Sequence, residues 1–150
     1  ASGKVSSGFG ILKLLALGAD ACYSARSMML ALGCIQALQC NSNHCPVGVA
    51  TQDKHLMAGL VPSDKRIRVA NFHHETLKSF CEMLGAIGLA SPVDLRPWHV
   101  MHRVSPVITK HYGELYDYLE EGALLREPLP EHYRRAVESA SAETFGHVPA

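Results

Sequence analysis

Three cysteines crowded into an uncharged segment constrain this chain more than any other feature. Cys34 and Cys40 are six positions apart, Cys40 and Cys45 are five apart, and residues 27–52 contain no Asp, Glu, Lys or Arg. The chain has five cysteines, so disulfide pairing would leave one thiol over, and no secretory signal is recognisable. Ligation of a metal or a cluster is therefore the better prediction for these three thiols.

The backbone decides whether the three thiols can meet. In one straight helix, Cys34 and Cys40 would lie about 9 Å apart along the axis and would point to different sides. We therefore expect the preceding helix to end near Gln39, because the polar residues from Asn41 onward favour a loop.

The number of thiols indicates the type of site. The pair Cys45-Pro46 resembles the end of bacterial ferredoxin motifs. Three thiolates suit a three-iron cluster, whereas a four-iron cluster or a zinc site needs a fourth ligand. His44, Cys22 and Cys81 qualify by residue type but not by spacing. Two alternatives stay open, namely three buried structural cysteines and a zinc site that stabilises a structural domain.

A second candidate site lies near the start of the chain. In a β/α barrel, the loops after the seventh and eighth strands often bind a phosphate. Ser2-Gly3-Lys4 would follow the seventh strand, with Gly3 allowing the backbone to approach the anion, and Ser24-Ala25-Arg26 would follow the eighth. Lys4 or Arg26 would then neutralise the phosphate charge. The structural alternatives are an ordinary turn glycine and a solvated helix start.

The remaining pattern predicts an α/β beginning followed by helices. We expect a buried parallel strand over residues 19–25 and a loop over 41–52. The longest helix is expected to be capped by Ser63, and prolines are expected to break the chain from Ser105 into short helices. The helices are expected at residues 8–17, 26–38 and 64–84, from Ser91-Pro92 onward, and at 131–142.

Composition argues against nucleic acid or a membrane as a partner of this segment. The formal net charge is zero, which gives no bulk attraction to nucleic acid or to a membrane surface. The apolar run that ends at Leu38 has about 12 residues, whereas a helix needs roughly 20 to cross a bilayer core. We therefore expect no membrane span in this segment and a cytoplasmic location.

The segment Gly33–Asp53, which reads GCIQALQCNSNHCPVGVATQD, resembles the cluster motif of the synthase domain of glutamate synthases. That domain belongs to the FMN-binding glutamate-synthase-like group. Residues 68–73 and Leu95-Arg96-Pro97 are similar to its downstream helices, and the resemblance covers roughly residues 1–125. It implies the C-terminal part of an α/β fold, a (β/α)8 TIM barrel that binds FMN, followed by an iron–sulfur loop and a mostly α-helical tail.

The resemblance also implies a reaction. Cys34, Cys40 and Cys45 would hold a 3Fe-4S cluster, and the two turns would hold FMN. The enzyme would be an oxidoreductase acting on CH-NH2 donors, forming glutamate from 2-oxoglutarate and ammonia or glutamine-derived ammonia. A ferredoxin or an NAD(P)H-dependent partner would donate the electrons. The rival reading, of a different class, is a non-catalytic iron–sulfur electron-transfer module.

The expected domain organisation follows from the same resemblance. Residues 1–39 would be the last barrel units, 34–53 the cluster loop, 54–104 a helical extension and 105–150 a C-terminal tail. The chain does not begin with Met, and we expect it to be a fragment that is inactive alone, with the residues that contact 2-oxoglutarate on upstream loops and its catalytic residues unassigned. Larger synthases have a second glycine where this chain has Lys4, and they continue into a glycine-repeat β-helix. Both departures favour the shorter branch of the family.

Overall fold

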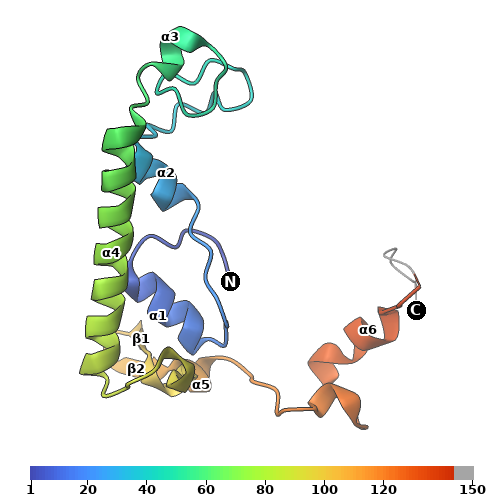
Figure 1. Ribbon diagram of the computed structural model, residues 1–150. Coiled ribbons are helices and arrows are strands. Elements are labelled where there is room, and N and C mark those ends of the chain that lie inside the picture. Colours follow the sequence, from blue (N-terminus) through green and yellow to red (C-terminus); the bar gives the residue numbers. More distant parts are fainter. Residues whose placement is uncertain (144–150) are drawn as a thin grey trace. The chain divides into compact units, whose positions relative to one another are not determined.

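The computed structural model describes residues 1–143 and forms two compact units, Ala1–Leu115 and a second that begins at Tyr116. Residues 144–150 of the expected tail lie outside the described residues. The first unit is built along one long helix, α4 (Figure 1). Its elements are α1 (Gly8–Ala16), α2 (Arg26–Leu32), α3 (Lys54–Met57), α4 (Pro62–Ala86), β1 (Met101–Ser105), β2 (Ile108–His111) and α5 (Tyr112–Leu115).

The segments that precede α1 and α2 run parallel to each other. Ser2 and Tyr23 form a parallel bridge, and the Tyr23 N–H donates to the Ala1 carbonyl oxygen at 2.8 Å. The predicted strand over residues 19–25 is therefore reduced to a single bridge. Neighbouring parallel segments joined through a helix are the arrangement of a βαβ unit.

Helix α1 begins as the sequence predicts. Ser7 is its N-cap, and the Ser7 hydroxyl oxygen accepts a hydrogen bond from the Gly10 N–H at 3.1 Å. Gly8 lies directly against α4, because a Cβ atom added to it would be only 2.5 Å from the Phe80 backbone nitrogen. The core that forms around this contact consists of Leu12, Ala16, Phe80, Leu84, Leu95, Val100 and Tyr112.

Helix α2 is shorter than predicted. It ends at Leu32 rather than at Leu38, because Gly33 adopts a left-handed conformation with φ of 109°. The Gly33 N–H donates to the Leu30 carbonyl and the Cys34 N–H donates to the Met29 carbonyl at 3.0 Å. This pair of bonds is a Schellman motif, which closes a helix and turns the chain away from its axis. The prediction of a helix up to residue 38 is wrong.

Helix α4 confirms the prediction of one long helix over residues 64–84, but it starts earlier. Val61 occupies the N-cap position and Pro62 is the first helical residue, so the prediction that Ser63 is the cap is wrong. Proline is favoured there because its φ suits the helix and its missing N–H needs no partner. The helix predicted from Ser91-Pro92 is only a short 3-10 turn over Pro92–Asp94, which ends where Leu95 becomes extended.

A β-hairpin replaces the first part of the expected helical tail. β1 and β2 are antiparallel, with Met101 opposite His111 and His102 opposite Lys110. The Ser105 hydroxyl oxygen accepts the Ile108 N–H at 3.1 Å and so closes the turn. The expectation of short helices from Ser105 is therefore wrong for residues 105–111, where Pro106 belongs to a hairpin turn.

The second unit has a short 3-10 helix, Ala123–Leu125, and α6, Glu131–Ser139. The predicted helix over residues 131–142 is confirmed at its start and ends three residues early. An exposed ion pair joins Arg134 to Glu131 at 3.2 Å, and the His132 Nε2 atom lies 3.5 Å from the Asp117 carboxylate. Within residues 1–143, no helix has the length and apolar character needed to cross a membrane.

Candidate functional site

The two turns proposed for phosphate binding lie next to each other. The bridge between Ser2 and Tyr23 places residues 2–4 beside residues 24–26. The Ser24 hydroxyl donates to the Val5 carbonyl oxygen at 2.8 Å, which joins the second turn to the residue after Lys4. The structure therefore brings together two segments that are about twenty positions apart in the sequence.

Ser27 strengthens this connection. Its side chain is buried, it donates to the same Val5 carbonyl at 2.7 Å, and its hydroxyl also contacts that of Ser24. One backbone carbonyl is thus held by two hydroxyl groups, one from the turn before α2 and one from the first turn of α2. The sequence alone does not indicate Ser27, because a serine in a helix usually faces solvent or bonds to its own helix.

The backbone of the first turn has an unusual shape. Gly3 has φ of 101° and Lys4 has φ of 54°, so both are left-handed. Nothing lies within 4 Å of the position that a Cβ on Gly3 would occupy. The glycine is required by its conformation, and the space beside it is open to a ligand. Lys4 and Arg26 are both exposed.

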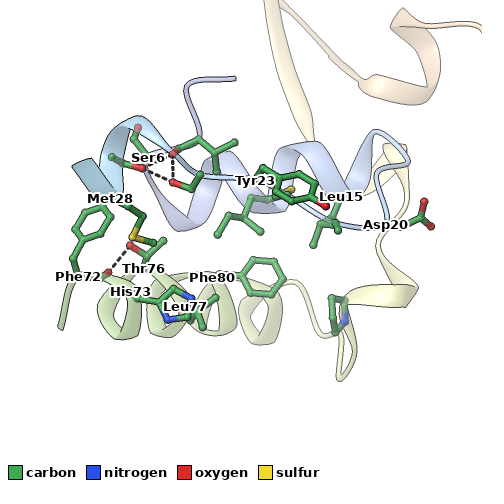
Figure 2. Close-up of a pocket in the computed structure, with 17 residues that line it drawn as sticks. Ser6, Leu15, Asp20, Tyr23, Met28, Phe72, His73, Thr76, Leu77 and Phe80 are labelled. Atoms are coloured by element: carbon green, nitrogen blue, oxygen red, sulfur yellow. Dashed lines mark hydrogen bonds between the residues drawn. The ribbon is translucent and has the colours of Figure 1, made fainter. Parts of the chain in front are cut away.

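A cavity of about 430 Å³ lies close to these turns, between α1, α2 and α4 (Figure 2). Phe72, His73, Leu77 and Phe80 project into it from α4. Ser24 and Ser27 belong to its lining, so the hydroxyl pair that holds Val5 also faces this space. The lining is otherwise mostly apolar.

The cysteine loop lies at the N-terminal end of α4, together with α3 (Figure 1). Cys45 is buried, Cys34 is half-buried and Cys40 is exposed, and all five cysteines of the chain are free thiols. Across residues 1–143, no group of three His, Cys, Asp or Glu side chains is arranged to hold a metal ion. The structure therefore places the three cysteines in one loop without bringing their sulfur atoms together.

The surroundings of two of these thiols suit cluster ligands. Backbone N–H groups lower the pKa of the Cys45 thiol, Ala50 having the largest effect and Val47 the next, while burial acts in the opposite direction. The Gln36 N–H donates to the Cys34 sulfur at 3.4 Å. Backbone donors stabilise the thiolate form, which is the form that binds iron. The chemistry of the thiols thus suits iron–sulfur ligands, although the three sulfur atoms do not converge within residues 1–143.

Hydrogen bonds hold the second half of the loop. The Thr51 hydroxyl donates to the Asn43 carbonyl at 2.6 Å, and its oxygen accepts the Asp53 N–H at 3.1 Å. The Asn43 side chain accepts the Gln52 N–H at 2.6 Å. Asp53 then caps α3 by accepting the N–H groups of His55 and Leu56. The loop that carries the cysteines is thereby anchored to α3.

Gly48 sets the distance between the loop and α3. It is buried with φ of 77°, and a Cβ there would be 2.4 Å from the Leu56 carbonyl oxygen. Three other loop residues, Gln36, Leu38 and Asn43, also have positive φ. These conformations are costly for residues other than glycine, and they cluster at functional sites.

Residues 1–90 match the family described as the conserved region in glutamate synthase. The chain belongs to the glutamate synthase family. The match includes both candidate sites, the phosphate turns and the cysteine loop, and ends just after α4.

Several proteins are similar to this chain in sequence. It is 41% identical over 103 residues to the glutamate synthase large subunit-like protein YerD of Bacillus subtilis. The aligned residues cover 69% of this chain and 20% of that protein. It is 38% identical over 96 residues to the archaeal glutamate synthase [NADPH] of Methanocaldococcus jannaschii, covering 64% and 19%. The chain therefore spans about a fifth of the length of these relatives. No solved structure matches it significantly.

Proposed function

We propose that this chain carries the FMN phosphate turns and the iron–sulfur loop of a glutamate synthase that forms glutamate from 2-oxoglutarate and ammonia. The observation that carries the proposal is the cysteine loop, in which backbone N–H groups lower the Cys45 pKa and one donates to the Cys34 sulfur. Family membership supports it, since the matched region includes this loop.

The barrel is part of the same proposal. Two parallel segments, each followed by a helix, are what the last units of a (β/α)8 barrel would contribute. The Ser2–Tyr23 bridge and the α1 crossover between them support this interpretation. The substrate-contacting residues would then belong to other barrel loops.

Each cofactor would have defined residues. Ser2, Gly3 and Lys4, with Ser24, Ala25 and Arg26, would bind the FMN phosphate, and Cys34, Cys40 and Cys45 would bind a 3Fe-4S cluster. When bound, the two cofactors supply the electrons that reduce the nitrogen-containing product of 2-oxoglutarate and ammonia to glutamate. The chain itself fixes the backbone donors, through the left-handed Gly3 and the anchored loop around Cys45.

The electron donor and the nitrogen source are also part of this proposal. The names of relatives specify NADPH in the archaeal protein and ferredoxin in a chloroplastic or mitochondrial protein of Arabidopsis thaliana. We propose a ferredoxin or an NAD(P)H-dependent partner as the electron donor, with free or glutamine-derived ammonia as the nitrogen source, in the cytoplasm.

Replacement of single cysteines in the complete protein tests this proposal. Cys34→Ser, Cys40→Ser and Cys45→Ser should each lower the iron and sulfide content of anaerobically purified protein, because each removes one ligand. Cys22→Ser and Cys81→Ser are the matched controls and should leave both contents unchanged. Zinc without sulfide in the wild-type protein, or full iron in any of the first three variants, would contradict the proposal.

A further inference from the structure

Lys65 extends from α4 to the end of α2. Its ammonium nitrogen lies 3.8 Å from the position that a Cβ on Gly33 would occupy, and Gly33 is bonded directly to Cys34. Since consecutive Cα atoms are 3.80 Å apart, the ammonium nitrogen is at most about 9 Å from the Cys34 Cα. A lysine ammonium therefore lies within about 9 Å of the Cα atom of the first cysteine of the loop.

The surroundings of Lys65 limit the screening of its positive charge by water and salt. Its side chain is only 19% exposed, and it borders an apolar groove between α2 and α4 that includes Met28, Leu32 and Val69. Apolar neighbours and limited exposure reduce screening by water and salt. The Asp64 carboxylate lies 3.3 Å from the ammonium but is 59% exposed, so it offsets the charge only in part.

The loop itself has no Asp, Glu, Lys or Arg side chain that could place a charge near Cys34. Residues 27–52 contain no Asp, Glu, Lys or Arg, so any formal side-chain charge near Cys34 must come from another segment. Lys65 supplies one from 31 positions further along the chain. No local sequence pattern reveals this contact.

A cation at this place has a definite effect on a thiolate-bound cluster. Three thiolates give the bound cluster a net negative charge, and each added electron makes it more negative. A nearby positive charge therefore stabilises the reduced form more than the oxidised form, and net charge is one of the factors that set cluster potentials. We propose that Lys65 raises the reduction potential of the cluster bound by Cys34, Cys40 and Cys45, an inference that rests on the proposed function.

Lys65 also lies at the C-terminal end of α2, where a cation stabilises the helix dipole. A purely structural role would change stability and leave the potential unaltered. The test must therefore measure the potential of the cluster itself, together with the iron content and the thermal stability of each variant.

The experiment is a redox titration of the complete, anaerobically purified protein, followed by the electron paramagnetic resonance signal of the oxidised three-iron cluster. Lys65→Gln should shift the midpoint potential to a lower value, and Lys65→Arg, which keeps the charge, should stay near the wild type. Lys78→Gln is the matched control, because it removes the same charge from the same helix roughly 20 Å further along the axis. It should leave the potential unchanged.

A second variant covers the case in which Lys65→Gln loses iron. Asp64→Asn removes the carboxylate beside the ammonium and should shift the potential upward by a smaller amount. If Lys65→Gln keeps its iron, an unchanged midpoint potential would overturn the role of Lys65. If Lys65→Gln holds no iron, an unchanged midpoint potential in Asp64→Asn would overturn it. The absence of iron and sulfide from the wild-type protein would instead overturn the proposed function.

Discussion

The helical core and the cysteine loop both depend on a glycine, but what surrounds each glycine differs. Gly8 allows α1 to approach α4 inside an apolar core that includes Leu12 and Phe80. Gly48 allows the loop to approach α3, where hydrogen bonds of Thr51 and Asp53 hold the chain. The core is thus stabilised by apolar burial, whereas the loop is stabilised by polar contacts. A substitution in one region should therefore destabilise that region and leave the other folded.

The largest effect is expected at Gly8. Gly8→Ala places a Cβ atom 2.5 Å from the Phe80 nitrogen and 3.0 Å from backbone atoms of Ser79 and Thr76. Backbone atoms cannot move aside as a side chain can, so the free energy of unfolding should fall by about 2–3 kcal/mol. Denaturant unfolding of the complete protein measures it.

Gly10→Ala is the matched control, because it makes the same change two positions along the same helix. The nearest atom to its Cβ would be the Ser7 hydroxyl oxygen at 3.5 Å. Here the better helix propensity of alanine should raise stability by up to about 1 kcal/mol. Equal stability of the two variants would contradict the close α1–α4 contact.

The second effect separates the loop from the core. Gly48→Ala combines a Cβ 2.4 Å from the Leu56 carbonyl oxygen with a left-handed φ, so the loop should open locally. We expect the protein to lose most of its iron while the unfolding of the helical core stays within about 1 kcal/mol of the wild type. Iron analysis and hydrogen exchange of α4 amides measure the two.

Gly59→Ala is the control for this change, since it also faces the Leu56 carbonyl oxygen but at 3.4 Å, with no positive φ. It should retain its iron. If Gly48→Ala kept full iron, or destabilised the core as much as Gly8→Ala, the two regions would not be independent.

The third change is at Gly3, where neither close packing nor burial is involved, so only the strained backbone and the proposed FMN site are affected. Gly3→Val must accept a φ of 101° in open space, which costs about 1–2 kcal/mol. Gly18→Val is its match, with φ of 105° and nothing within 4 Å. Both should lose similar stability, yet Gly3→Val alone should weaken FMN binding, measured by flavin fluorescence. Unchanged FMN affinity in Gly3→Val would place the phosphate elsewhere.

The sequence predicts the elements whose signals are local. Ser7 marks the start of α1, and the apolar residues of α4 recur at helical spacing. The end of α2 was predicted wrongly because apolar residues continue to Leu38, although the left-handed Gly33 stops the helix. The sequence does not predict the hairpin, because Pro106 suggests a break between helices, whereas it lies in a turn between two strands.

In the candidate site too, features with a local sequence signal can be predicted, and contacts between distant segments cannot. The type and number of thiols could be read from the sequence, and so could the glycine and serine turns at the start of the chain. The backbone donors that lower the Cys45 pKa depend on the fold of residues 47–50. The contacts of Ser27 with Val5 and of Lys65 with Gly33 join distant segments, and no local pattern encodes them.

The Schellman motif at the end of α2 limits which donors can serve the first thiol. The Cys34 N–H is already engaged with the Met29 carbonyl at 3.0 Å, so it cannot also turn toward a sulfur atom. The donor to the Cys34 sulfur comes instead from Gln36, whose own φ is 56°. The polarity around the first thiol is therefore controlled two residues downstream. Gln36→Pro would remove that donor and would also force residue 36 out of its left-handed shape, because proline holds φ at about −65°.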